Sequence, residues 1–280
     1  MANFKNQCFQ RFIQPLTPAD NLSSFIYTNA LLRSANKLKY PLLHFWTLED
    51  TVILGLKDQR LPHLSTALTS LTHRGFHYFM RNSGGLAVVS DDGILNLSIF
   101  YPWHLEDHEL TIDEAYQRMV DLIQAAFPSL KIATGEITHS YCPGSFDISV
   151  NGQKIGGISQ RRNKMGVTVM LYLSVGGNQQ DRGKLIRDFY DTGLQQSQNK
   201  WHFPDVWPGA MTTISKALNT QLSVQDAIQR IQSVVQIIVP DSLNNLLWSP
   251  NFISTLNKEL ISMERLQERL EKEDQSESLL

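Results

Sequence analysis

The segment Tyr141–Arg162 reads YCPGSFDISVNGQKIGGISQRR and contains the strongest β-hairpin signal of the chain. Asn151 and Gly152 stand between two β-prone runs, and both residue types accept the positive φ that a two-residue hairpin turn requires. This turn places Val150 opposite Gln153, Ser149 opposite Lys154, Ile148 opposite Ile155 and Asp147 opposite Gly156. Side chains alternate across a strand. The predicted core face therefore carries Phe146, Ile148, Val150 and Ile155, and the polar face carries Asp147, Ser149 and Lys154.

Lys154 has two interpretations on that polar face. It either forms an exposed ion pair with Asp147, which contributes only ~0.2–1 kcal/mol, or it lines a site. The glycine pair Gly156–Gly157 follows it directly, and glycines inside a strand often mark the close approach of a ligand or of another backbone. Gly84–Gly85 repeats this feature between two other predicted strands, although glycine pairs also form bulges and bends.

Cys142 stands in a Pro-Gly loop directly before the hairpin. A lone cysteine is most often a buried small hydrophobic residue, but a loop of this composition favours a position near the surface. A thiol within reach of an ammonium group is held as the reactive thiolate, which makes Cys142 a candidate nucleophile beside Lys154. His139, three residues upstream, is a competing activator.

The rest of the chain predicts a mixed α/β (α+β) domain with a short helical extension. Helices are expected over 21–38, 61–74, 113–127 and 223–236, and strands over 42–46, 51–56, 76–81, 86–90, 94–101 and 166–175. The polar pair His104 and His108 has helical spacing, but a solvated loop after Pro102 is the favoured interpretation, and we expect no metal site. We expect a catalytic domain over residues 20–250 and a helical C-terminal tail over 251–280.

The composition excludes several classes of protein. The chain has 280 residues, 42% of them hydrophobic, and a formal net charge of -2, which argues against bulk affinity for nucleic acid. It lacks a run of about 18 apolar residues, so no membrane span is expected. Its two cysteines, Cys8 and Cys142, form no disulfide framework, and free thiols favour the cytoplasm. Arg161, Arg162 and Lys164 lie in a stretch without acidic residues, which suggests either a solvated strand end or a docking surface for an acidic partner.

Three segments together resemble the cysteine-dependent octanoyltransferases of the biotin/lipoate protein ligase superfamily. CPGSFDISVNGQKIGGISQRR, with Cys142 twelve positions before Lys154, is the most specific of them. RNSGGLAVVSDDGILNLSIF at 81–100 resembles the Arg-x-x-Gly-Gly acyl-pocket segment, and TVILGLKDQ at 51–59 resembles the Val-x-x-Gly-x-x-Gln/Asp strand end. The resemblance covers roughly residues 20–250 and does not extend into the tail.

The resemblance implies a central mixed β-sheet flanked by helices, with a tunnel for a C8 chain. It implies that Cys142 forms an acyl-thioester and that Lys154 favours its thiolate form. Arg81, Ser83, Gly84 and Gly85 match the acyl-pocket segment, and Gly156 and Gly157 are further candidates for substrate binding. No cofactor is expected.

The sequences of the Cys142 segment and of the GISQRR segment are most similar to one branch of the family. That branch moves octanoyl from the glycine-cleavage H protein, the donor, to lipoyl domains of 2-oxoacid dehydrogenase E2 subunits, the acceptors. Neither nucleic acid nor a membrane is expected as a partner. The alternatives are an octanoyl-carrier-protein transferase, an ATP-dependent lipoate ligase and a non-catalytic binder of lipoyl domains. Leu86 and Asn82 depart from the residues that ligases usually carry, a third Gly and a second Arg.

Overall fold

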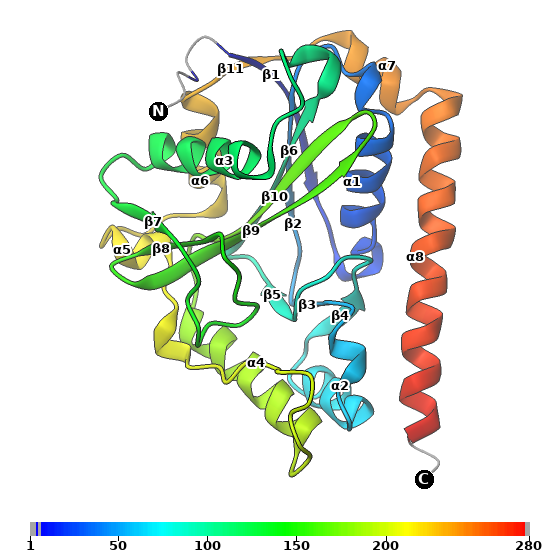
Figure 1. Ribbon diagram of the computed structural model, residues 1–280, viewed down its shortest axis with the longest axis vertical. Helices are drawn as coiled ribbons and strands as arrows, with labels where there is room; N and C mark the ends of the chain where they lie inside the picture. Colours follow the sequence, from blue (N-terminus) through cyan, green and yellow to red (C-terminus); the bar gives the residue numbers. More distant parts are fainter. Residues whose placement is uncertain (1–3, 5–6, 278–280) are drawn as a thin grey trace.

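A large mixed β-sheet forms the centre of the computed structural model, which describes Phe4 and residues 7–277, with side chains as far as Leu270. The sheet has the strand order β11-β1-β2-β6-β10-β9-β8-β7 (Figure 1). Its strands are β1 (Cys8–Pro15), β2 (Leu42–Thr47), β6 (Ile94–Pro102), β7 (Ile132–Thr134), β8 (Asp147–Val150), β9 (Gln153–Asn163), β10 (Gly166–Ser174) and β11 (Gln236–Ile238). The pairs β1–β11 and β1–β2 are parallel and the other pairs are antiparallel.

The central strands have the sequences expected of strands covered on both faces. Every residue of β6 is buried, and β2 is buried except at its end. Strands covered on both faces read as continuous apolar runs rather than as alternating patterns. The edge strands β7 and β11 have three residues each, which leaves little unpaired backbone at either edge.

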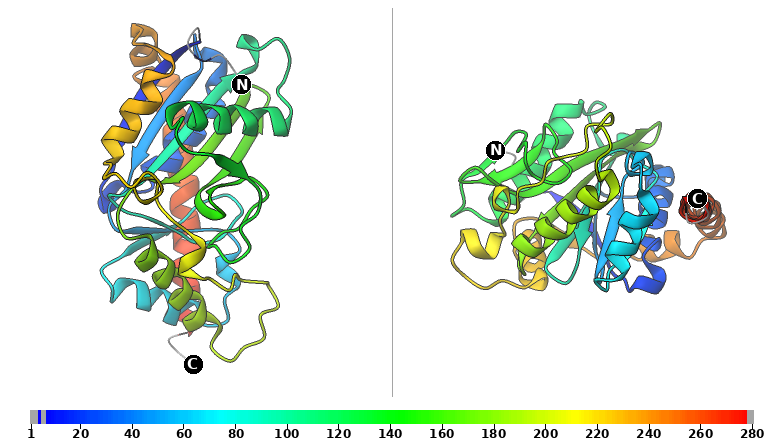
Figure 2. Two further views of the ribbon diagram at one scale, coloured as in Figure 1. Left: turned by 90° about the vertical axis from the view of Figure 1, so that its left-hand side faces the viewer. Right: turned by 90° about the horizontal axis from the view of Figure 1, so that it is seen from below.

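Helices cover both faces of this sheet. The helices are α1 (Ser23–Arg33), α2 (Leu64–Thr72), α3 (Ile112–Ala126), α4 (Gln179–Leu194), α5 (Ile214–Ala217), α6 (Val224–Ser233), α7 (Asp241–Leu247) and α8 (Pro250–Glu277). The α3 and α6 helices pack on one face and build the largest hydrophobic core, while α1 covers the other face. Helix α8 lies along the outer side of α1 and reaches α2 (Figure 2). No helix in the described part of the chain is both long and apolar enough to cross a membrane.

A second, three-stranded sheet lies beside the large one. Its order is β4-β3-β5, formed by β3 (Thr51–Leu54), β4 (His77–Met80) and β5 (Val88–Ser90). Together with α2 and α4 it encloses a separate hydrophobic core, which also includes Tyr141 and Leu270. The two sheets therefore meet at the loop that carries Cys142, which packs partly buried against this core.

The structure confirms the mixed sheet flanked by helices and most predicted elements, with several differences. Strand β1 was missed, because CFQRFIQP alternates only weakly and its partner β2 is distant in the sequence. The first helix ends at Arg33 rather than residue 38, since a short 3₁₀ turn follows over Ala35–Lys37. Residues 234–236 leave the last predicted helix, and Gln236 begins β11. Residues 250–277 form α8, and residues 278–280 of the expected tail lie outside the described residues.

The hairpin register is correct at the turn and wrong further from it. Ser149 pairs with Lys154 and Val150 with Gln153, as predicted. Beyond Ser149 a β-bulge shifts the pairing by one residue, so that Ile148 faces Gly156 and Asp147 faces Gly157. Ile148 and Ile155 nevertheless both enter the large core, as predicted, and Asp147 pairs with Lys154. Phe146 lies at the margin of the predicted core face, half-buried and stacked on Tyr116.

Candidate active site

Cys142 occupies a strained position at the junction of the two sheets. Its φ of 48° lies in the left-handed region, which costs a non-glycine residue free energy and persists only where the surroundings enforce it. The preceding Tyr141 provides such an anchor, because its ring is buried and its hydroxyl bonds the Tyr172 hydroxyl at 2.7 Å and the Gln179 amide at 2.9 Å. The anchor leaves the Cys142 side chain partly exposed.

Lys154 holds the loop of Cys142 through its backbone. The ammonium Nζ donates to the Cys142 carbonyl oxygen at 2.8 Å, to the Tyr141 carbonyl oxygen at 3.1 Å and to Ser140 Oγ at 3.2 Å. It also lies 2.9 Å from Asp147 Oδ1, and both side chains are buried. Lys154 therefore forms a buried ion pair, and the interpretation as an exposed surface pair is wrong.

Lys154 and Asp147 together form one wall of the site, and Asp147 reaches it from the bulged strand β8. Its Oδ2 accepts hydrogen bonds from the backbone N–H groups of Gly144 and Ile137. Burial raises the pKa of Asp147, and the ammonium of Lys154 and the two N–H groups oppose that shift. Because an unpaired buried carboxylate is costly, Asp147 and Lys154 stabilise each other and together fix the loop that ends at Gly144.

Arg81 forms the opposite wall. Its buried guanidinium donates to the carbonyl oxygens of Gly84, Ile53 and Leu86, which folds residues 81–86 into a tight loop. One guanidinium nitrogen lies 3.9 Å from Cys142 Sγ, and the Leu86 N–H points at the same sulfur with an N to Sγ distance of 3.3 Å. Both groups are donors, and both favour negative charge on sulfur.

Glycine is required at two positions of this wall. Gly85 has a φ of 93°, and a Cβ there would lie 2.5 Å from the Arg81 guanidinium and 3.2 Å from Cys142 Sγ. A Cβ at Gly55 would lie 2.1 Å from the Gly85 carbonyl oxygen. The two glycines allow the loop to reach the sulfur. Gly84 is exposed with open space around it, and half-buried Ser83 contributes its carbonyl oxygen to the Leu56 N–H.

A buried carboxylate behind this wall was missed by the sequence analysis. Asp58 is fully buried, and it accepts hydrogen bonds from the Gly55 N–H at 2.8 Å and from the Tyr190 hydroxyl at 2.9 Å. The same hydroxyl accepts from the Ala87 N–H at 2.9 Å. Burial raises the pKa of Asp58 to about 6, against the effect of these hydrogen bonds and of the positive charges of Arg81 and Lys57. Asp58 belongs to the Val-x-x-Gly-x-x-Asp segment, whereas no local signal pointed to Tyr190.

The remaining candidate residues make their contacts with other parts of the chain. Gly156 has a packing role, because a Cβ there would lie 2.4 Å from the Tyr172 carbonyl oxygen of β10. A Cβ at Gly157 would only touch Asp147 and Lys154 at ordinary distances. His139 stacks on Trp207 and bonds the Asp205 carbonyl oxygen, and among the described residues it has no hydrogen bond with Cys142. No cluster of possible metal ligands occurs in the described part of the chain.

Most side chains of the predicted basic patch on β9 form contacts with other residues of the same chain. Arg161 donates to Asn29 and to both oxygens of Asn82. Arg162 donates to the Leu110 carbonyl oxygen and lies over the Trp103 ring. These two arginines fasten β9 to its neighbours, and of the three residues only Lys164 remains without such a contact among the described residues.

The site thus combines a partly exposed thiol with two hydrogen-bond donors that point at its sulfur. A buried cation, Lys154, donates to the carbonyl oxygen of the same cysteine. A thiolate in this position can attack a carbonyl carbon from the open side of the loop. The Leu86 N–H and the Arg81 guanidinium are also close enough to stabilise negative charge that develops on an attacked carbonyl.

Comparisons with known proteins identify the family of the chain. Residues 20–236 match the family model of the lipoyl protein ligase A/B catalytic domain. The chain is 41% identical over 217 residues to the octanoyl-[GcvH]:protein N-octanoyltransferase of Lysinibacillus sphaericus, which covers 76% of this chain and 77% of the relative. It is 38% identical over 245 residues to the lipoyl-[GcvH]:protein N-lipoyltransferase of Listeria monocytogenes, which covers 85% and 87%.

Solved structures share the fold at much lower identity. A putative lipoate protein ligase from T. acidophilum with bound lipoic acid superposes with a TM-score of 0.64 at 16% identity, covering 92% of this chain and 99% of that chain. Lipoate-protein ligase A bound with ATP superposes with a TM-score of 0.63 at 15% identity, covering 90% and 93%. Family model, relatives and fold agree: the chain is an acyltransferase that belongs to the lipoyl protein ligase A/B catalytic domain family.

Proposed function

We propose that this protein moves an octanoyl group from the lysine of the octanoylated glycine-cleavage H protein to lysines of lipoyl domains of 2-oxoacid dehydrogenase E2 subunits. The donor is proposed from the relatives named octanoyl-[GcvH]:protein N-octanoyltransferase. The acceptor is proposed from the resemblance and from an archaeal lipoylation system of similar fold, a bipartite lipoate protein ligase described together with its E2 lipoyl domain. Both cysteines of the chain are free, which is consistent with work in the reducing cytoplasm.

The observation that carries the proposal is the position of the Cys142 sulfur between two donors. The Leu86 N–H at 3.3 Å and the Arg81 guanidinium at 3.9 Å both stabilise a thiolate. In the proposed first step the thiolate attacks the octanoyl-lysine carbonyl carbon, the C–N bond breaks, and the donor lysine leaves as an amine after taking up a proton. In the second step the acceptor amine attacks the thioester, the C–S bond breaks, and the acceptor nitrogen loses a proton as the thiolate reforms.

The energetics fit an exchange without ATP. An amide is broken and an amide is formed, so the overall reaction is nearly isoenergetic. The difficulty is kinetic, because an amide is a poor electrophile, and a thioester intermediate divides the exchange into two easier acyl transfers. We assign Lys154 to the positioning of the Cys142 loop, since its contacts go to the loop carbonyl groups. Arg81 then supplies a positive charge in contact with the sulfur, at 3.9 Å.

Intact-mass spectrometry tests the proposal directly. The protein is incubated with octanoylated H protein in the absence of ATP, and the expected result is an adduct of one octanoyl group that Cys142→Ala does not form. An adduct that persists in Cys142→Ala would falsify the thioester mechanism. Cys8→Ala is the matched control, because the second cysteine is also free but lies on β1. Parallel incubations with lipoylated H protein, octanoyl-carrier protein, and octanoate plus ATP identify the cargo and donor.

A further inference from the structure

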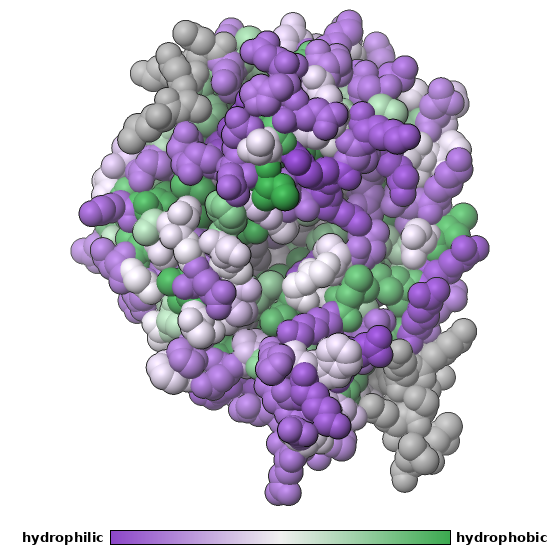
Figure 3. Space-filling view, viewed as in Figure 1, coloured by the Kyte–Doolittle hydropathy of each residue, from purple (hydrophilic) through white to green (hydrophobic). Residues whose placement is uncertain are grey.

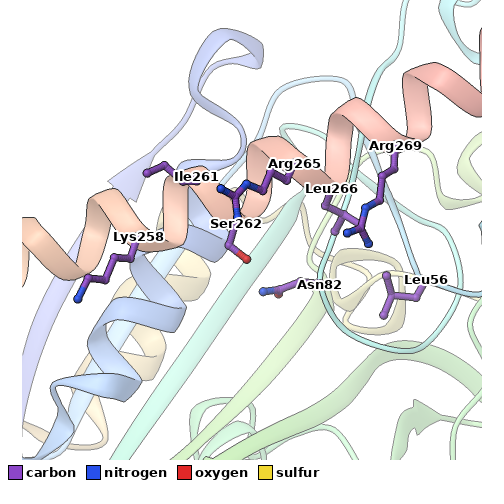
Figure 4. Close-up of a pocket in the computed structure, with 8 residues that line it drawn as sticks. All are labelled: Leu56, Asn82, Lys258, Ile261, Ser262, Arg265, Leu266 and Arg269. Atoms are coloured by element: carbon purple, nitrogen blue, oxygen red, sulfur yellow. The ribbon is translucent and has the colours of Figure 1, made fainter.

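The groove between α8 and the Arg81 loop lies outside the site described above. It has a volume of about 340 Å³ and is lined by Leu56, Asn82, Lys258, Ile261, Ser262, Arg265, Leu266 and Arg269. Figure 4 shows Ser262 and Leu266 of α8 on the side of the helix that faces Asn82 and Leu56. The family resemblance ended before α8, so no motif predicted that this helix would contribute to a binding surface.

Three exposed cations of α8 line this groove. Lys258, Arg265 and Arg269 form no hydrogen bond or ion pair with any side chain described up to Leu270. Their spacing of seven and four residues keeps them on one face of the helix. The neighbouring Glu259 is buried and forms an ion pair with Arg33. The residues that line the groove therefore include three cations and no acid, whereas the exposed Glu264 and Glu268 of the same helix do not line it.

The groove also offers apolar surface. Leu56 and Ile261 are 40% and 47% exposed, and Leu266 lies between the cations on the same helix face. This face of the molecule is hollowed in the middle, with apolar surface next to polar side chains (Figure 3). An apolar centre with a charged rim is the usual composition of a protein-docking surface.

The groove is directly continuous with the Cys142 site. Asn82 follows Arg81, the residue whose guanidinium approaches Cys142 Sγ. The Leu56 N–H donates to the Ser83 carbonyl oxygen, so the same short loop forms the edge of the groove and the wall of the site. A protein bound in the groove would therefore lie next to the loop that contacts the Cys142 sulfur.

We propose that this groove docks an acidic surface of the carrier domain whose lysine bears or receives the acyl group. The proposal rests on the proposed function, because it assumes that a protein-bound lysine is delivered to Cys142. Carboxylates beside that lysine would pair with Lys258, Arg265 and Arg269 of α8. Because this pairing depends on complementary charge, the same surface can receive the donor and the acceptor in turn.

Charge reversal in the groove tests the proposal. The variant Lys258→Glu/Arg265→Glu/Arg269→Glu is compared with Lys37→Glu/Lys39→Glu/Lys131→Glu, which changes the net charge equally at exposed positions that do not line the groove. We expect the groove variant to raise KM for the octanoylated carrier at least about tenfold at low salt, and the control to leave it within about twofold. The neutral variant Arg265→Gln/Arg269→Gln should show a smaller increase, and it serves if the triple reversal does not fold.

A small substrate separates this proposal from the proposed function. Acylation of Cys142 by p-nitrophenyl octanoate requires no docking, so the groove variant should react with it at the unaltered rate. Raising the salt from about 0.05 M to about 0.5 M should raise KM for the carrier in the unaltered protein and much less in the groove variant. An unchanged KM in the groove variant, or an equal rise in the control, overturns the docking proposal. Failure of the unaltered protein to react with the ester would instead count against the Cys142 nucleophile.

Discussion

Cys142 lies between two loops that are each supported by a buried carboxylate, and the two carboxylates have different partners. On one side Asp147 forms an ion pair with Lys154 at 2.9 Å, and Lys154 in turn holds the carbonyl groups of Tyr141 and Cys142. On the other side Asp58 has only neutral hydrogen-bond donors among the described residues, the Gly55 N–H and the Tyr190 hydroxyl. One wall is fixed by paired charges and the other by a single buried carboxyl group.

The difference changes the role that the sequence analysis expected for Lys154. Lys154 was expected to act on the sulfur, but its hydrogen bonds go to the backbone of the loop and to Ser140. Arg81 was expected to line the acyl pocket, yet its guanidinium is the charged group with a contact to the sulfur. We therefore propose that positioning the nucleophile and stabilising its charge are tasks of opposite walls.

The largest expected effect comes from breaking the ion pair. Lys154→Met leaves the Asp147 carboxylate buried without its partner, so the free energy of unfolding should fall by about 3–5 kcal/mol. Asp147→Asn/Lys154→Met removes both charges and should recover most of that loss in urea unfolding. Thioester formation should stay slow in both variants, because neither supplies a donor to the Cys142 carbonyl group. Equal stability of the single and double variants would contradict the buried pair.

The carboxyl group without an ion-pair partner predicts a pH dependence of stability. The pKa of Asp58 is about 6 in the folded protein against an ordinary value of 3.8, so the folded state takes up the proton first as the pH falls. The stabilisation is complete below 3.8 and is lost as the pH rises through about 6. A shift of about two units corresponds to about 3 kcal/mol.

Urea unfolding at pH 4 and pH 7 measures this contribution, with Asp58→Asn as the reference that cannot titrate there. The stability of the unaltered protein relative to Asp58→Asn should be about 2.5 kcal/mol greater at the lower pH, because the stabilisation is not yet complete at pH 4. Other carboxyl groups titrate in both proteins and cancel in the difference. The same relative stability at both pH values would show that Asp58 does not carry a raised pKa.

The sequence predicted the local features of the site better than its long-range ones. The Asn151-Gly152 turn determines the first two strand pairs, because turn chemistry is local. No local pattern signals the bulge beyond Ser149 or the close approach of β10 to Gly156. The Asp58–Tyr190 hydrogen bond joins residues 132 positions apart. The sequence shows that Lys258, Arg265 and Arg269 are charged, but only the folded structure shows that they line one groove and form no ion pair with the acids described up to Leu270.

The smallest expected effect concerns the charge beside the sulfur. Arg81→Lys keeps a positive charge but loses the planar fork that donates to the carbonyl oxygens of Gly84, Ile53 and Leu86. The loop that presents the Leu86 N–H should loosen, and thioester formation should slow about 30-fold, equivalent to about 2 kcal/mol. Arg74→Lys is the matched control, because Arg74 is an exposed arginine paired with Asp188, and its effect should remain within about 0.5 kcal/mol.

A second variant distinguishes a contact with the sulfur from a purely structural role. Arg81→Gln removes the positive charge as well as the fork, so thioester formation should slow further than in Arg81→Lys if the guanidinium charge stabilises the sulfur. Equal slowing in the two variants would instead mean that Arg81 only shapes the loop. In that case the charge on the sulfur would have to be stabilised from the Lys154 wall, and the division of tasks between the two walls would be wrong.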